Sequence, residues 1–539
     1  MLGSAAALDV CAPLTSVFYN LETRREFTKV EEWAFSEGSM KRPIDEIETE
    51  IFERGREVMR KMLEAHIRAR GQGDVGSGVE VSDGAGEAVD HTHRRIQECH
   101  QHTLFGDVRV ERLAYHHPGE ESIRPLDEQM HLPQRSFSYP LQHMLVRRAV
   151  QGPFDEAIEA VEHITGSSIS KRSAETLTQD AATDFDLFYE QRSLMPPEQT
   201  ASIVVGTVDG KGVPMVKEAP AQPVVRLGRG EKANKKRMST VAAVYTIEPR
   251  VRTPEDVADS LFRPELKLVA GGKGKKSQRS ERSKPEQKRV WASLEKSKDD
   301  VIQEVGKEME VRDPQRCKRR VVVTDGERAL QIRVLKHMPG ILLVLDLLHV
   351  LEKLWTAAHI FHDEGSPEAL IWVREHALRI LRGQVAQVVK GIRQSATKRG
   401  IRGKNRQTLD SITGYLYRNR EFMRYNQYLA EGLPIASGAV EGACKNLVKD
   451  RMERSGMRWK LPTAEAVLKM RALYLSGDFE EYWAFHIKQE QARLREGRTW
   501  CPIYVDKKIT VGTSVSTCPP HRSRRAQLTH RAPTLSVWR

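Results

Sequence analysis

Three apolar runs in this sequence have the composition of buried β-strands, and each is followed directly by an aspartate. The runs span residues 201–208, 320–324 and 340–345, and the aspartates are Asp209, Asp325 and Asp346. Continuous apolar runs of this length are typical of strands that are buried on both faces of a sheet. Because sites in open α/β sheets gather at the carboxyl ends of strands, the pattern predicts an α/β fold with acidic side chains at one sheet edge.

A fourth acid, Glu441, lies in the segment between Pro434 and Trp459. Ser437 and Gly438 are typical of a helix start, so Glu441 falls in the first turn, where the helix dipole favours a carboxylate. Basic and aromatic residues follow it: Lys445, Lys449, Arg451, Arg454, Arg458 and Trp459. An acid among phosphate-binding charges indicates a metal site acting on nucleic acid. The alternative is a capped, amphipathic surface helix.

The charge balance favours a polyanionic partner. Lys and Arg number 86 against 73 Asp and Glu, a net charge of +13, which favours nucleic acid or another anionic surface over an acidic protein. Residues 502–539 carry seven Lys or Arg against one Asp and predict a disordered basic tail. Gly271–Arg289 carries eight against two Glu, and belongs to a basic loop system expected over 228–290.

Cysteine usage and hydropathy predict a cytoplasmic protein. The six cysteines form no CxxC pair, which argues against a disulfide framework and a Cys-only zinc site. No basic segment precedes the short apolar run at the N-terminus, so no signal peptide is expected. The longest apolar run, Ile341–Leu351, contains Asp346 and His349 and is shorter than the ~20 residues of a membrane span.

Helical periodicity dominates the N-terminal third. Residues 43–70 predict one long amphipathic helix. In residues 105–115, apolar and polar residues alternate, which is typical of a strand or hairpin arm. Residues 154–165 and 169–177 predict two helices joined at Gly166, with Ser168 as the N-cap of the second. The pair is compatible with a helix-turn-helix that contacts DNA through Lys171 and Arg172, and equally with an ordinary helical hairpin.

The order strand-Asp, strand-Asp, helical segment, helix-Glu resembles the DDE transposases. The closer similarity is to their Mutator-like branch and the Kra-type bacterial insertion-sequence transposases. It covers roughly residues 100–480 and is carried by the following segments: Val204–Gly210, Val321–Leu330, Leu345–His349, Ser437–Asn446 and Arg454–Trp459.

The resemblance implies an α/β fold with a ribonuclease H-like mixed sheet core, split by an all-helical insertion and preceded by a helical DNA-binding region. It implies that Asp209, Asp325 and Glu441 are catalytic and bind Mg²⁺ or Mn²⁺, and the chemistry favours two ions. Asp346 and His349 match a D-x-x-H motif of the Mutator-like branch, which implies a supporting role. Asp346 is also the main rival of Asp325 as second ligand.

The predicted function is therefore a transposase that binds insertion-sequence ends and catalyses metal-dependent cleavage and strand transfer. Its expected partner is double-stranded DNA in the bacterial nucleoid, and the resemblance implies a homo-oligomer on DNA. Lys171 and Arg172 are predicted to bind the ends, and Lys445, Lys449, Arg458 and Trp459 to hold DNA, Trp459 by stacking on a flipped base. The alternatives are a related nuclease without strand transfer and an inactive or domesticated copy that only binds DNA.

Six segments are expected along the chain. They are a helical region with a Gly-rich linker (1–90), a helical DNA-binding region (91–199), the core strands (200–349), a helical insertion (350–430), the core helix with Glu441 (431–490) and a basic tail (491–539).

Overall fold

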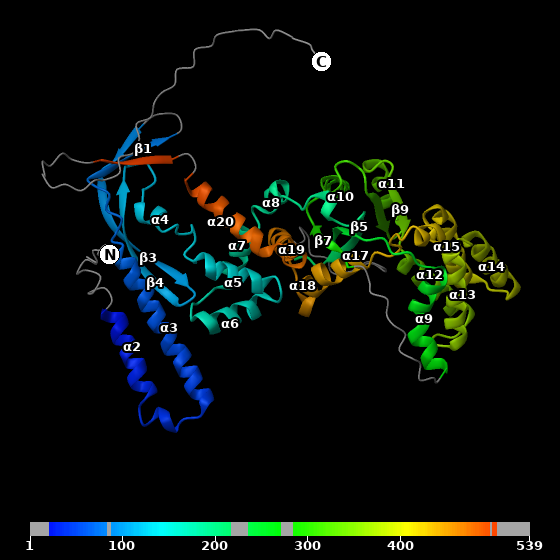
Figure 1. The fold of residues 1–539 in the computed structure, drawn as a ribbon, viewed down its shortest axis with the longest axis horizontal. Coiled ribbons are helices and arrows are strands. Elements are labelled where there is room, and N and C mark those ends of the chain that lie inside the picture. The colour runs from blue at the N-terminus through cyan, green and yellow to red at the C-terminus, as the bar shows by residue number, and fades with distance from the viewer. Residues whose placement is uncertain (1–20, 84–87, 217–235, 271–283, 496–497, 504–539) are drawn as a thin grey trace, which may run out of the picture.

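The computed structural model describes residues 21–83, 88–216, 236–270, 284–495 and 498–503 (Figure 1). These residues form a mixed α/β structure with three β-sheets, the largest of which has five strands. The predicted α/β class is therefore confirmed. None of the described helices contains an apolar stretch that could cross a bilayer.

The five-stranded sheet has the spatial order β7-β6-β5-β8-β9. Its strands are β5 (Ile203–Val213), β6 (Arg237–Ile247), β7 (Glu286–Ser293), β8 (Arg319–Thr324) and β9 (Leu342–Leu345). Strand β6 is antiparallel to both of its neighbours, whereas β5, β8 and β9 are parallel. The other four strands thus all run in one direction.

Both faces of this sheet are buried, as the apolar runs predict. On β5, Val204 and Val208 contact the core on one side, whereas Ile203 and Val205 contact the core on the other. Gly206 lies between them, where an added Cβ would come within 2.9 Å of Val305 Cγ1. A glycine at this position lets helix α10 (Lys298–Arg312) pack closely on the strand.

A helical region follows β9 and packs on the face that contains Ile203 and Val205. Its helices are α12 (Leu347–Phe361), α13 (Pro367–Leu381), α14 (Val385–Lys398), α15 (Gly403–Arg418) and α16 (Tyr425–Ala430). Together they occupy the chain between the last strand of the sheet and the segment that bears Glu441.

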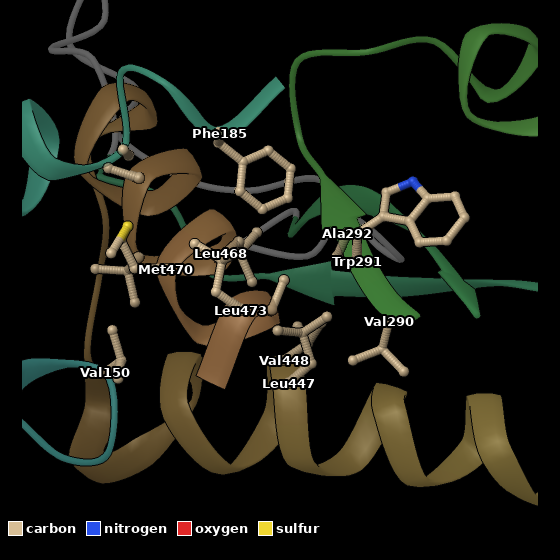
Figure 2. Packing of buried hydrophobic residues seen from close by; sticks show 14 of the residues in the cluster. Val150, Phe185, Val290, Trp291, Ala292, Leu447, Val448, Leu468, Met470 and Leu473 are labelled. Atoms are coloured by element: carbon tan, nitrogen blue, oxygen red, sulfur yellow. The ribbon is translucent and has the colours of Figure 1, made fainter. Parts of the chain in front are cut away.

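The other face of the sheet carries the C-terminal helices. Glu441 lies in α17 (Gly438–Ala443), which continues as the π-helix η4 (Cys444–Lys449) and as α18 (Asp450–Met452). Helix α19 (Leu461–Ser476) packs against β7 and η4. Figure 2 shows this core, in which Leu447 and Val448 of η4 face Leu468 and Leu473 of α19, near residues 290–292 of β7.

The prediction of a basic loop over residues 228–290 is wrong in part, because most of the described residues in this range form helices or strands. Strand β6, helix α9 (Pro254–Ala270) and the start of β7 lie within it. Strand β7 forms because residues 290–293 pair with β6 and are buried. Residues 228–235 and 271–283 lie outside the described part of the chain.

The N-terminal region begins with two helices, α2 (Leu21–Ala34) and α3 (Ile44–Ala69), which pack side by side (Figure 1). The long helix predicted over 43–70 is confirmed. The expected Gly-rich linker, however, contains strands β1 (Gly78–Asp83) and β2 (Ala88–His91). Strand β1 also pairs with β10 (Arg498–Ile503).

The expectation of a disordered tail from residue 491 is therefore wrong for its first part. Helix α20 (Phe479–Arg495) extends into it, and β10 follows. Trp500 of β10 packs against a small core that includes Val79 and Tyr115, which stabilises the pairing. Residues 504–539 lie outside the described residues.

Residues 91–199 are not wholly helical as expected, because they open with a long antiparallel hairpin of β3 (His93–Thr103) and β4 (Gly106–His116). The strand predicted over 105–115 is thereby confirmed. The helices that follow are α4 (Pro125–Gln129), α5 (Tyr139–Ala149), α6 (Phe154–Thr165), α7 (Lys171–Ala181) and α8 (Phe185–Gln191). The N-cap of α7 is Ser170 instead of the predicted Ser168, because the Ser170 hydroxyl accepts a hydrogen bond from Ser173 N.

Candidate metal centre

The register of the sheet brings three aspartates side by side. Val208 of β5 pairs with Thr324 of β8, and Thr324 pairs with Leu345 of β9. The next residues in the three parallel segments are Asp209, Asp325 and Asp346, so all three lie at the same edge. The Asp346 N–H donates to the Thr324 carbonyl at 2.8 Å, which extends this register one residue beyond the strands.

Asp209 lies within β5 and not at its end as predicted, because β6 pairs with β5 as far as Val213. One carboxylate oxygen, Oδ1, accepts from Gly210 N at 2.6 Å. The other, Oδ2, accepts from the Cys444 thiol at 3.1 Å. Burial, followed by the charge of Asp209, raises the pKa of Cys444, so the thiol keeps the proton that it donates. Sequence reasoning missed Cys444, although it follows Glu441 by three residues and so shares its helix face.

Asp325 follows β8 in a tight turn. Its Oδ1 accepts from Glu327 N at 2.9 Å, and its backbone carbonyl accepts from the Tyr415 hydroxyl of α15 at 2.7 Å. Gly326 has φ +86°, and a Cβ there would lie 2.5 Å from the Tyr415 oxygen, so the turn requires glycine. Burial raises the pKa of Asp325, and the charge of Asp209 raises it further.

Asp346 is completely buried and is the N-cap of α12. Its Oδ1 accepts from Leu348 N at 2.8 Å, and its Oδ2 accepts from the hydroxyl of Ser437 and, at 3.3 Å, from Ser437 N. The Nδ1 of His349 lies 3.5 Å from Asp346 Oδ2, at ion-pair distance. This contact with Asp346, opposed by burial, raises the pKa of His349 to about 9.

Glu441 reaches the site from α17, which contacts β5, β6 and β7. Burial raises the pKa of Glu441, and the charge of Asp346 adds to this effect. One ligand atom each of Asp346, His349 and Glu441 lie within 4.8 Å of one another. Among the described residues this is the one group of three metal-type ligands that are so close, and it includes neither Asp209 nor Asp325. Asp346, the predicted rival of Asp325, is therefore the aspartate that joins Glu441 in this group.

Among the described residues, the one ion pair to the acids of the site comes from His349, which lies 3.5 Å from Asp346. Within the described part of the chain, no lysine or arginine forms an ion pair with Asp209, Asp325 or Glu441. Four carboxylates with one imidazole as their counterion attract a divalent ion, and their oxygens suit Mg²⁺ or Mn²⁺. The imidazole of His349 favours a transition metal, so the complete donor set fits Mn²⁺ better than Mg²⁺.

The predicted DNA-binding residues differ in their surroundings. Lys171 and Arg172 are exposed at the start of α7, where Lys171 pairs with Asp155 at 2.8 Å. On the segment that follows Glu441, the side chains of Lys445, Lys449 and Arg458 are all exposed.

The prediction that Trp459 stacks on a base is wrong, because its side chain is buried. Its indole N–H donates to the Met452 carbonyl at 2.9 Å, and its ring packs near Phe154. The Arg451 guanidinium lies 4.8 Å from the centre of the same ring. Trp459 therefore anchors the end of the Glu441 segment in the protein core.

Two buried arginines join this segment to the end of α5. Arg451 was expected among the phosphate-binding charges, but its side chain is completely buried, and sequence reasoning did not single out Arg471. Arg451 donates to the carbonyl of Ala149 at 2.8 Å, and Arg471 donates to the carbonyl of Val150. Burial lowers the pKa of Arg451 to about 9, with the charges of Arg471 and Arg454 contributing. The carbonyls at a helix C-terminus carry partial negative charge, which compensates part of this cost.

The sequence matches no protein-family model, and a search of curated proteins finds no match either. The geometry of the candidate metal centre is therefore the basis for assigning a function.

Proposed function

We propose that this protein is a metal-dependent transposase that binds insertion-sequence ends, cleaves a DNA strand there and transfers it to a target. The observation that carries the proposal is the meeting of Asp209, Asp325 and Asp346 at one sheet edge with Glu441 from a covering helix. Acids in this arrangement serve phosphodiester cleavage when they hold divalent ions, which activate a nucleophilic oxygen and stabilise the leaving oxygen.

The topology supports a ribonuclease H-like core. If the five strands are numbered along the chain, their spatial order is 3-2-1-4-5, and only the second is antiparallel to the rest. This is the arrangement expected of such a core. The helices from α12 to α16 lie between the fifth strand and Glu441, where the resemblance implies a helical insertion.

Two sets of ligands share Glu441 in the proposed centre. Asp346 and His349 complete one set with Glu441, and Asp209 and Asp325 supply carboxylates on the neighbouring strands. The Cys444 thiol and the Gly210 N–H hold the Asp209 carboxylate, while the Ser437 hydroxyl and the Leu348 N–H hold that of Asp346. These contacts fix the carboxylates before an ion binds, which lowers the cost of assembling the site.

Exposed basic residues on the segment that follows Glu441 supply the proposed DNA contacts. Lys445, Lys449 and Arg458 follow Glu441 in the chain, and contacts of this kind to phosphates position a duplex without reading its sequence. Lys171 and Arg172 stay our candidates for binding the element ends, although Lys171 would have to exchange Asp155 for a phosphate.

The test is single-strand cleavage of labelled duplexes, taken from the DNA that flanks the coding sequence, with Mg²⁺ or Mn²⁺. Asp209→Asn, Asp325→Asn, Asp346→Asn and Glu441→Gln are compared with the wild type. We expect each of the Asp209 and Glu441 variants to lose about 10²-fold or more in rate while DNA binding is unchanged. Asp363→Asn, which changes an exposed aspartate of the helical region, is the matched control.

The products separate the alternatives. Joined products in the presence of target DNA indicate strand transfer, whereas cleavage without joining indicates a nuclease. Tight binding without cleavage by the wild type would contradict the enzymatic proposal and favour a DNA-binding protein. If Asp346→Asn is inactive and Asp325→Asn is active, Asp346 is the second ligand.

A further inference from the structure

The helical pair of α2 and α3 has little core of its own. Helix α2 buries only Thr23, and the 26-residue α3 buries only Val58, Ala65 and Ile67. Helices in proteins owe most of their stability to the packing of an apolar face. The main contacts of α3 are with α2 and β4, and Figure 1 shows the far end of the pair projecting from the rest of the molecule.

Large apolar side chains are exposed along this pair. Of the 21 exposed large hydrophobic residues in the described chain, nine fall between Leu21 and Met62. The most exposed are Ile44 at 77%, Phe35 at 76% and Met40 at 70%. Monomeric soluble proteins seldom expose apolar side chains in such a concentration, and patches of this kind mark interaction sites.

The apolar residues of α3 form a stripe. Ile44, Ile51, Met59 and Met62 follow one another at spacings of seven, eight and three, so they lie along one side of the helix. Gly55 lies on the same stripe, and a Cβ at that position would meet nothing within 4 Å. A glycine inside a helix costs roughly 0.5–1 kcal/mol relative to alanine, and no contact among the described residues requires it. The close approach of another helix would require it.

The charges of α3 are divided between its two halves. Residues 44–53 contain five acids and no base, whereas residues 54–70 contain six Lys or Arg and two Glu. Two copies of α3 that cross antiparallel place each acidic half against a basic half. A parallel arrangement places like charges together, which is unfavourable. Pairing about Gly55 sets Ile51 of one copy opposite Met59 of the other.

We propose that the α2–α3 pair is a dimerisation surface that binds the same pair of a second copy of this chain, with the two α3 helices antiparallel. The apolar stripe, Gly55 at the crossing point and the self-complementary charge each support a second copy as the occupant. Such an interface is isologous, because the same residues contribute from both chains. It does not depend on the proposed catalytic function.

The first test is the mass of the full-length chain in solution, without DNA, by sedimentation equilibrium. We expect twice the 61.2 kDa of one chain for the wild type. The double variant Ile51→Asp/Met59→Asp places four carboxylates at the crossing of the dimer and should raise the dissociation constant at least about tenfold. The matched control is Ile332→Asp, at an exposed isoleucine of α11 (Arg328–His337), which should stay dimeric.

A charge exchange tests the antiparallel arrangement. Glu46→Lys/Glu48→Lys reduces the net charge of the acidic half from −5 to −1, and Lys61→Glu/Arg68→Glu reduces that of the basic half from +4 to 0. Each variant alone should dimerise more weakly than the wild type. A mixture of the two should form a heterodimer, because the unchanged acidic half of one copy then lies against the unchanged basic half of the other. Circular dichroism verifies that both variants retain their helices.

Three results would overturn the proposal. In the first, the wild type is monomeric but dimerises once residues 1–20 are removed, which would identify those residues as the occupant of the stripe. In the second, the chain is monomeric both with and without residues 1–20, which would leave a foreign partner or no partner. A dimer that survives Ile51→Asp/Met59→Asp would place the interface elsewhere.

Discussion

Strands β5 and β8 and helix α3 come from equally clear sequence patterns but have opposite surroundings. Strands β5 and β8 are buried on both faces by helices of the same chain, whereas α3 buries three of its residues. An apolar run predicts that a strand is covered, and an apolar stripe predicts that a helix has a partner. Within the part of the chain that the structure describes, the strands are covered, whereas the stripe of α3 has no partner.

The difference determines which substitutions should affect cleavage. The acids of the candidate centre take their positions from the register of β5, β8 and β9, so a change that moves the sheet moves them too. The α2–α3 pair contributes no residue to the centre. Substitutions in the two regions should therefore separate stability and cleavage from association.

The largest effect is expected from Gly206→Val in β5. A Cβ at this position would lie 2.9 Å from Val305 Cγ1 and 3.0 Å from Met309 Sδ, so α10 would have to shift. Overpacking costs about 1–3 kcal/mol in the free energy of unfolding and sometimes more, and the three added carbons of valine place this substitution at or above the upper end of that range. Urea unfolding measures the change. Gly414→Ala in α15, where a Cβ meets nothing, is the control and should be slightly stabilising. Equal stabilities of Gly206→Val and wild type would contradict the packing described for β5.

Asp346→Ala is expected to rank second. It removes the N-cap of α12 and leaves the buried Ser437 hydroxyl without its acceptor, at a combined cost of about 2–3 kcal/mol. Asp346→Asn keeps an oxygen for Leu348 N and should lose about half as much. If both variants unfold at the same urea concentration as wild type, the carboxylate has no structural role and acts only as a ligand.

A smaller effect is expected from Tyr415→Phe in α15. The substitution removes the hydrogen bond from the Tyr415 hydroxyl to the Asp325 carbonyl, which is worth about 1 kcal/mol. Because the helical region then no longer holds the Asp325 turn, the loss in cleavage rate, expressed as a free energy, should exceed the loss in the free energy of unfolding. Tyr417→Phe, at an exposed tyrosine of the same helix, is the control. Unchanged cleavage in Tyr415→Phe would show that the β8 register alone positions Asp325.

Local sequence patterns predicted those parts of the centre whose structure depends on residues close by in the sequence. The strands before Asp325 and Asp346 and the helix start before Glu441 were identified from composition and capping. What failed depends on contacts between distant segments. The length of β5 depends on its pairing with β6, so Asp209 proved to lie inside a strand.

The same reason explains the other errors. Strand β10 is stabilised by β1, from the opposite end of the chain, so its residues alone resemble a disordered tail. Trp459 is buried against Phe154 and Arg451, and a basic neighbourhood in the sequence gives no sign of that burial. The choice between Asp325 and Asp346 depends on side-chain geometry at the sheet edge, which no strand pattern specifies.

The smallest effect on the core is expected from Ile51→Asp in α3. Ile51 is 43% exposed and lies on the stripe far from the candidate centre. The free energy of opening that hydrogen exchange measures in β5 and β8 should therefore change by no more than about 0.5 kcal/mol in either direction. Exchange in α2 and α3 should accelerate, because these helices lose the packing that a second copy provides. Single-strand cleavage should be unchanged, since all four acids of the centre come from one chain. Faster exchange in β5 would contradict this separation and show that the helical pair and the sheet unfold as one cooperative unit.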